Sequence, residues 1–145
     1  MIKILCLGKL KEKYLKELVS DYEKRISKYH KIEIVELKDE NDMTLEKEHI
    51  LQHINNRDYV IALDISGNHL DSVSFARKLE SVFLESSSIV FVIGSSLGLH
   101  EDIKKRANYS LSFSEMTFPH GLFRGMILEQ IYRAFKIINN ESYHK

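Results

Sequence analysis

The chain has 145 residues, 43% of them hydrophobic and 29% charged, and its formal net charge is zero. These values are ordinary for a globular protein large enough to bury a core, and the neutral charge argues against a broad nucleic-acid-binding surface. No apolar run approaches the roughly 18 residues that a membrane span requires. The single cysteine, Cys6, cannot form an internal disulfide, and we interpret it as a small hydrophobe in a strand. We therefore expect one cytoplasmic domain over residues 1–145, without a membrane partner.

The first third of the chain carries an uneven distribution of charge. Residues 9–31 contain eight Lys or Arg against four Asp or Glu, whereas residues 33–48 contain seven acidic residues against two lysines. Both segments could be solvated helix faces, or the basic one could face an anionic polymer. The pattern alone leaves both interpretations open.

Apolar runs predict five strands. The runs are short, rich in β-branched residues and bounded by glycine or polar residues, and they cover residues 1–7, 32–37, 59–65, 88–93 and 109–114. The run at 59–65 is almost continuously apolar, as in a central strand that is covered on both faces. The segment 66–68, Ser-Gly-Asn, predicts a turn directly after it.

Apolar residues at helical spacing predict a helix after each strand. The predicted helices cover about 11–29, about twelve residues after Met43, about 72–84, roughly 100–107 and about 121–139. We expect Leu45 on the inner face of the second helix and Val73 on the inner face of the third. Asp71 or Ser72 is a suitable N-cap for the third helix.

Strands that alternate with helices define an α/β fold with a mostly parallel sheet and helices on both faces. Ligands of such sheets bind beyond the carboxyl ends of the strands. We expect three loops, at 63–67, 94–99 and 113–118, to converge there on a small-ligand pocket. The loop at 94–99 lacks the lysine and the glycine spacing of phosphate-binding loops, so it is either a ligand loop or a plain strand-to-helix turn.

The polar residues do not form a recognisable metal or catalytic motif. The seven histidines are scattered, and His49 and His53, which are four residues apart, lack the acidic partner of a zinc motif. We therefore predict no metal. Catalytic triads are recognised by geometry rather than by order in the chain, so spacing alone identifies none.

The last third of the chain contains long, specific motifs. They are Leu-Ser-Phe-Ser-Glu-Met-Thr-Phe-Pro-His-Gly-Leu-Phe-Arg at 111–124, Glu-Gln-Ile-Tyr-Arg-Ala-Phe-Lys-Ile at 129–137 and the terminal Tyr-His-Lys. Together with Leu-Gly-Lys-Leu-Lys-Glu-Lys-Tyr at 7–14, they closely resemble the bacterial large-subunit ribosomal RNA pseudouridine N3-methyltransferases, the RlmH family of the SPOUT superfamily. The resemblance extends over essentially the whole chain.

This resemblance implies a SPOUT-type fold whose C-terminal segment forms a trefoil knot. It also implies a homodimer and S-adenosylmethionine (S-adenosyl-L-methionine) as methyl donor. The implied substrate is a pseudouridine of 23S rRNA, methylated at N3 within the assembled ribosome. Two other functions stay open, a non-catalytic ribosome-binding factor and a SPOUT methyltransferase that acts on tRNA.

The family motifs also imply which residues contact the donor. By their match to the motifs they are Leu63, Gly94, Phe113, Ser114, Glu115, Met116, Thr117 and Phe118. This chain departs from the family at Ser95, where a second glycine is common, and at Leu97, where a polar residue is more usual. We therefore expect a modestly altered loop with a retained site.

Five residues are candidates for contacts with the substrate. His144 is the first candidate for general base or substrate positioning, and His120 is the second. Arg133 and Arg124 could bind phosphate or stabilise a developing anion, and Tyr143 could stack on a base. Each has a plainer interpretation, such as a frayed tail at His144, a structural role at His120 or a dimer contact at Arg133.

Overall fold

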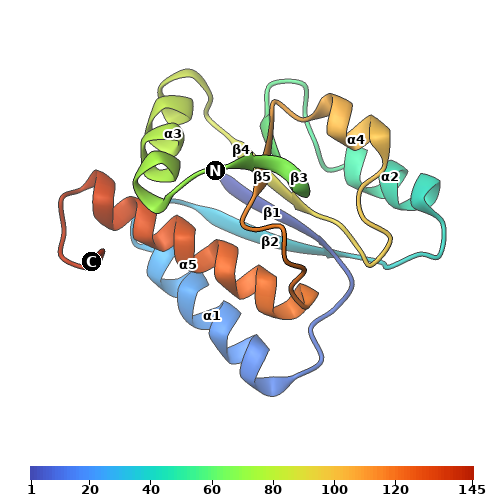
Figure 1. Cartoon of the computed structure of the whole chain (residues 1–145), viewed down its shortest axis with the longest axis horizontal. Helices are drawn as coiled ribbons and strands as arrows, with labels where there is room; N and C mark the ends of the chain where they lie inside the picture. The colour runs from blue at the N-terminus through green and yellow to red at the C-terminus, as the bar shows by residue number, and fades with distance from the viewer.

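Five strands and five helices alternate along the chain in the computed structural model, which describes residues 1–145 (Figure 1). The strands are β1 (Ile2–Leu7), β2 (Ile32–Leu37), β3 (Tyr59–His69), β4 (Ile89–Ile93) and β5 (Tyr109–Ser112). The helices are α1 (Lys13–Ser27), α2 (Met43–Leu51), α3 (Ser72–Glu85), α4 (Glu101–Arg106) and α5 (His120–Ile138). Every predicted element is present, and the α/β class is confirmed.

The strands form one sheet in the order β2-β1-β4-β3-β5, and all four neighbouring pairs are parallel. β4 lies in the middle, and all five of its residues are buried. β2 and β5 form the edges. The edge position of β2 explains why its residues are less buried than those of β1.

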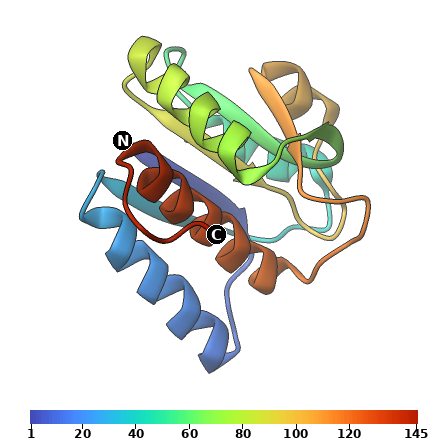
Figure 2. The ribbon, with the colours of Figure 1, turned by 60° about the vertical axis from the view of Figure 1, so that its left-hand side comes forward.

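Helices cover both faces of the sheet, because successive side chains of a strand point to opposite faces. On one face, Ile4 of β1 and Phe91 of β4 belong to a core shared with α1, α3 and α5. On the other face, Leu5 and Val92 belong to a core shared with α2 and α4. Figure 2 shows α1, α3 and α5 together on one side of the sheet, with α2 and α4 behind it.

The turn predicted at residues 66–68 is wrong, because β3 continues through it to His69. The pairing with β5 shifts register between Leu63 and Asn68, after which Asn68 lies opposite Leu111. The Asn68 side chain also donates a hydrogen bond to the Ser110 carbonyl oxygen, at 3.1 Å. Pairing with a neighbouring strand thus overrides the local turn preference of Ser-Gly-Asn.

The predictions that two residues lie on the inner faces of their helices are also wrong. Leu45 and Val73 are each 43% exposed. Successive residues of a helix are rotated by about 100° from one another. A residue next to a buried position, or two residues before one, therefore points in another direction. In α2 the buried positions are Glu46 and Ile50, and in α3 they include Phe75. The predicted cap is confirmed, since the Asp71 side chain accepts a hydrogen bond from the Ser74 amide at 2.7 Å.

Truncating the centre of the core tests this packing. Phe91 is fully buried in the middle strand, and we expect Phe91→Ala to lower the free energy of unfolding by about 3–5 kcal/mol because it leaves a cavity. The control is Leu84→Ala on α3, where the side chain is 85% exposed and the expected change is within about 0.5 kcal/mol. Urea denaturation measures both, and equal losses would contradict the described packing.

Candidate functional site

The carboxyl ends of β4 and β5 and the middle of β3 meet at a cavity of about 470 Å³, within the range of roughly 300–1,000 Å³ typical of small-molecule sites. We call it the strand-end cavity. Residues from all three predicted segments line it, because the three strands are neighbours in the sheet, but the segment at 63–67 is part of β3 and the prediction of a loop there is wrong. The lining residues are Leu63, Asp64, Ile65, Ile93, Gly94, Ser95, Ser96, Gly98, Leu99, Leu111, Ser112, Phe113, Ser114, Met116, Thr117, Phe118, His120 and Phe123.

The loop after β4 is a tight turn that depends on two glycines. The Ser95 carbonyl oxygen accepts a hydrogen bond from the Gly98 amide at 2.9 Å, which closes the turn. A Cβ atom on Gly94 would lie 2.6 Å from the Gly98 carbonyl oxygen, closer than real Cβ contacts allow. Gly98 has a φ of +84°, in the region that favours glycine. The small residues of this loop therefore allow it to fold back beside the cavity.

The buried carboxyl group of Glu46, on α2, anchors this loop. The Ser95 hydroxyl donates to Glu46 Oε1 at 2.8 Å and accepts from the Leu97 amide at 3.2 Å. The Glu40 amide donates to Glu46 Oε2 at 3.0 Å. Only 2% of Glu46 and 5% of Ser95 are exposed. Burial is the main cause that raises the pKa of Glu46, and its hydrogen bond with Asp39 adds to it.

Sequence reasoning missed Glu46. An available signal was its spacing, because Glu46 lies four residues before the buried Ile50 and so shares its helix face. The expectation of an apolar inner face led to Leu45 instead. In this chain Ser95 supplies a hydroxyl that a glycine could not, and the altered loop is anchored through it.

The segment between β5 and α5 forms the other wall of the strand-end cavity. Of the residues that the family motifs implied in this segment, all except Glu115 line the cavity. Two aromatic contacts stiffen the wall, since the rings of Phe113 and Phe118 lie 4.9 Å and 6.2 Å from that of Phe123. His120, the first residue of α5, also lines the cavity.

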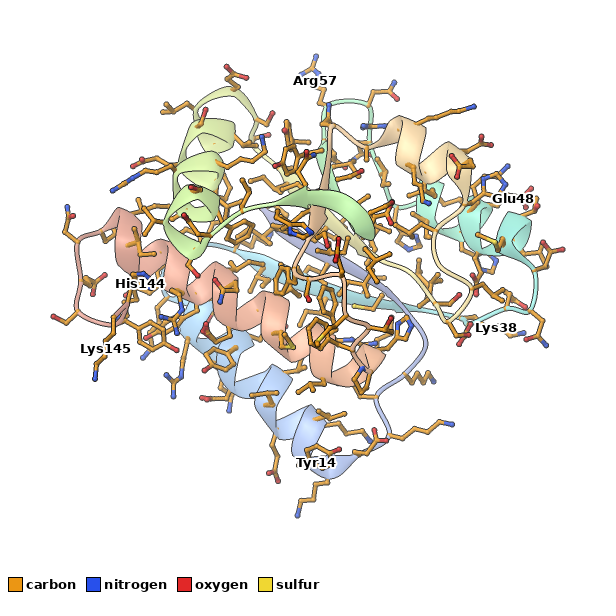
Figure 3. The ribbon with its side chains drawn as sticks, viewed as in Figure 1. Tyr14, Lys38, Glu48, Arg57, His144 and Lys145 are labelled. Atoms are coloured by element: carbon orange, nitrogen blue, oxygen red, sulfur yellow. The ribbon has the colours of Figure 1, made fainter.

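Three of the other four candidates for substrate contact form a separate group, the tail cluster of Arg133, Tyr143 and His144. Arg133 Nη1 lies 3.1 Å from His144 Nδ1, and its guanidinium carbon lies 4.8 Å from the ring centre of Tyr143. Arg133 Nε donates to Glu129 Oε1 at 2.9 Å. Figure 3 labels His144 near the C-terminal end of α5.

The hydrogen bonds of the tail cluster define its protonation. A guanidinium group only donates, so His144 Nδ1 is the acceptor in this contact and the ring N–H is assigned to Nε2. Burial, together with the hydrogen bond to Tyr22, raises the pKa of Tyr143 to about 12, so its hydroxyl stays protonated at neutral pH. The hydrogen bond to Glu129 raises the pKa of Arg133, which stays charged. The cluster therefore presents hydrogen-bond donors rather than a free base.

The terminal segment is held against the body of the protein. The hydroxyl of Tyr29, just after α1, donates to Glu141 Oε1 at 2.9 Å, and Lys136 Nζ lies 3.3 Å from Glu141 Oε2. The ring of Tyr143 packs edge-on against Tyr132, with 4.9 Å between ring centres. These contacts hold His144 against α5, so the C-terminal segment is not a frayed tail.

The tail cluster and the strand-end cavity lie at opposite ends of α5. His120 begins the helix and Arg133 lies thirteen residues further along, so a rise of about 1.5 Å per residue separates them by roughly 20 Å. Within one chain the structure brings His120 to the cavity and keeps the other three candidates away from it. A single subunit therefore cannot bring all four to one substrate atom.

Arg124 has a structural role in place of the predicted phosphate contact. It is 4% exposed, and Nη1 lies 2.6 Å from Glu36 Oε2 while Nη2 donates to the Gly8 carbonyl oxygen at 3.3 Å. Burial opposes ionisation of Glu36, but the hydrogen bonds from Arg124 and the Leu10 amide lower its pKa overall. This ion pair ties α5 to β2 and to the end of β1.

The structure contains no group of three or more His, Cys, Asp or Glu side chains arranged to hold a metal ion. No helix has both the length and the apolar character that crossing a membrane requires. The site is therefore described by the strand-end cavity and the tail cluster.

Comparison with known proteins gives extensive matches. The family model described as "Predicted SPOUT methyltransferase" matches residues 1–144. "Ribosomal RNA large subunit methyltransferase H 1" of Clostridium perfringens (strain SM101 / Type A) is 49% identical over 99% of both chains. "Ribosomal RNA large subunit methyltransferase H" is 48% identical over 99% of both chains in Clostridium botulinum (strain Langeland / NCTC 10281 / Type F) and 48% identical over all of both chains in Caldicellulosiruptor saccharolyticus (strain ATCC 43494 / DSM 8903 / Tp8T 6331).

The buried Glu46 gives a pH-dependent prediction. A carboxyl group whose pKa is raised by folding stabilises the folded state below its unfolded pKa of about 4.3, and this contribution is lost as the pH rises through the folded value. Glutamine cannot titrate, so the free energy of unfolding of Glu46→Gln relative to the unmodified protein should increase as the pH rises from about 4 to about 8.

Urea denaturation across this pH range measures the effect. Glu48→Gln, which removes an exposed charge from the same helix, is the matched control. Parallel stability curves for the unmodified protein and Glu46→Gln would contradict the raised pKa.

Proposed function

The chain belongs to the SPOUT methyltransferase family, and on that premise we propose that it methylates N3 of a pseudouridine in 23S rRNA, with S-adenosylmethionine as donor. The observation that carries the proposal is the strand-end cavity, to which the middle of β3 and the loops after the neighbouring parallel strands β4 and β5 contribute. The relatives named above as methylating large-subunit ribosomal RNA support the substrate class. Action on assembled ribosomes would make the protein cytoplasmic.

The residues of the cavity fit such a donor. Its volume lies within the range for small-molecule sites, and its wall combines apolar and aromatic side chains with small residues that leave backbone polar groups accessible. We propose that Leu63, Gly94 and the run 113–118 hold the donor. Within that run, Glu115 does not line the cavity, so its side chain has the weakest support.

Methyl transfer needs alignment and a deprotonated nitrogen. When bound, the donor supplies an electrophilic methyl group. N3 of the base must lose its proton, and the resulting negative charge spreads onto the two neighbouring carbonyl oxygens. His120 lines the cavity and is the better-placed group to accept the proton. His144 presents Nε2–H, and Arg133 is cationic, which suits both to stabilise those oxygens.

We propose that the enzyme works as a homodimer in which the tail cluster of one subunit serves the strand-end cavity of the other. The separation of roughly 20 Å between His120 and Arg133 supports this arrangement, because one chain cannot bring both to a single nucleotide. Large apolar side chains exposed near the cavity support a contact surface there, with Ile65 51%, Met116 75% and Leu122 39% exposed. The trefoil knot implied by the family stays a prediction.

The basic helix α1 is a further candidate for contact with RNA. The Lys13 side chain is 91% exposed, although it lies 3.9 Å from Glu17, and Asp21 pairs with Arg25 at 3.3 Å. These acidic neighbours reduce the positive field of the helix. We therefore propose α1 as an auxiliary contact within a ribosomal cleft that supplies most of the recognition.

Labelled S-adenosylmethionine, incubated with the protein and ribosomes from a strain lacking the modification, tests the main proposal. Free ribosomal RNA and bulk tRNA are the parallel substrates. We expect label in 23S rRNA of assembled ribosomes, mapped to N3 of a pseudouridine. Label in tRNA alone would favour a tRNA methyltransferase, and donor binding without any transfer would favour a non-catalytic ribosome-binding factor.

The shared-site arrangement predicts complementation between two inactive variants. His144→Ala should lower the turnover rate by about 100-fold or more while leaving donor binding intact, because it removes a hydrogen bond to developing charge. Gly94→Val should block donor binding, since its Cβ would clash with the Gly98 carbonyl oxygen. Co-expressed, the two variants should recover activity through mixed dimers that contain one intact site. Absence of recovery in verified mixed dimers would contradict the arrangement.

Charge reversal tests the contact proposed for α1. Changing Lys13 and Lys16 of α1 to Glu, together with Lys11 just before the helix, should weaken ribosome methylation several-fold and reduce its dependence on salt concentration. Lys38→Glu, at a side chain that is 79% exposed, is the control for a reversal outside α1. Unchanged methylation and unchanged salt dependence would remove α1 from the interface.

A further inference from the structure

The strand-end cavity contains a single carboxylate. Among its lining residues, Asp64 is the only Asp, Glu, Lys or Arg, and most of the others are apolar or carry a hydroxyl group. Asp64 lies near the point where β3 leaves its pairing with β4, directly after Leu63. Its side chain is 13% exposed, so its charge is largely withdrawn from water.

Two neighbours fix the orientation of this carboxylate. Oδ1 accepts hydrogen bonds from the Ser66 amide at 3.2 Å and from the Ser66 hydroxyl at 3.1 Å. Oδ2 lies 3.5 Å from Lys104 Nζ on α4. Lys104 does not line the cavity, and it also lies 3.7 Å from Glu101. The negative charge of Asp64 is thus held at the cavity wall. The positive charge of Lys104, which lies outside the cavity, balances part of it.

The reaction proposed above changes the charge of the molecule that occupies the cavity. Transfer forms a bond between N3 and the methyl carbon and breaks the bond between that carbon and sulfur, whose electron pair stays on sulfur. The proton of N3 goes to a base before the attack. The donor therefore carries a positive charge at sulfur, whereas the product, S-adenosylhomocysteine, is neutral there. The two molecules share every other group that an apolar wall could contact.

We propose that Asp64 is the specificity determinant that distinguishes the two, favouring the sulfonium donor over the neutral thioether product. This inference rests on the proposed function. A fixed carboxylate in a cavity of low polarity attracts a cation more strongly than it would in water, and it gives no such attraction to a neutral sulfur. The cavity thereby loses affinity for its occupant once the methyl group has left. Lys104 moderates the effect because its ammonium group offsets part of the carboxylate charge.

Two substitutions should change the preference in opposite directions. Asp64→Asn keeps the size of the side chain but removes its charge, and we expect it to lower the donor-to-product affinity ratio by about tenfold. Lys104→Met removes the balancing charge and should raise the ratio severalfold. Lys105→Met, at an exposed lysine on the same helix, is the matched control and should leave the ratio unchanged.

Isothermal titration calorimetry of S-adenosylmethionine and S-adenosylhomocysteine with the full-length protein measures these ratios without requiring turnover. A general disturbance of the cavity would weaken both ligands alike, so equal losses in Asp64→Asn would overturn the inference. An unchanged or lowered ratio in Lys104→Met would also overturn it, even if Asp64→Asn did not fold. Failure of the unmodified protein to bind either ligand would instead overturn the proposed function, and this inference with it.

Discussion

The parallel pairing of β4 with β3, and of β3 with β5, is the constraint on which the rest of the structure depends. Parallel neighbours end at the same edge of a sheet, so segments that are distant in sequence must meet there. The central strand β4 is buried on both faces, which fixes its ends firmly. The cavity, the glycine turn and the start of α5 all take their positions from this edge.

Periodicity predicted the order and type of every element, because each strand and most helices have an apolar pattern of their own. It failed where a tertiary contact opposes a local preference. Ser-Gly-Asn at 66–68 is drawn into a strand by β5, and Glu46 takes a buried position because Ser95 and a backbone amide satisfy its oxygens. β5 and Ser95 are both more than forty residues away in sequence, so a local pattern could not indicate these two contacts.

The candidate site was predictable in part for the same reason. The strand-end rule found the loops after β4 and β5, and the family motifs supplied residues within them, whereas the third predicted loop, at 63–67, is part of β3. His120 and His144 were candidates for the same role, but they lie near opposite ends of α5. Arg124 resembled a phosphate ligand in sequence, but its burial and its pairing with Glu36 are visible only once α5 is packed.

The buried pair of Arg124 and Glu36 also gives α5 a mechanical role. The pair fastens the helix to the sheet near its first turn, and the helix then runs without a break to the tail cluster. α5 consequently fixes the separation between the strand-end cavity and the tail cluster. Inserting one residue after Arg124 would advance the far end by about 1.5 Å and rotate it by about 100°, which would turn Tyr132 away from Tyr22 and Tyr29. Changes in length should therefore be tolerated in the surface loops but not within this helix.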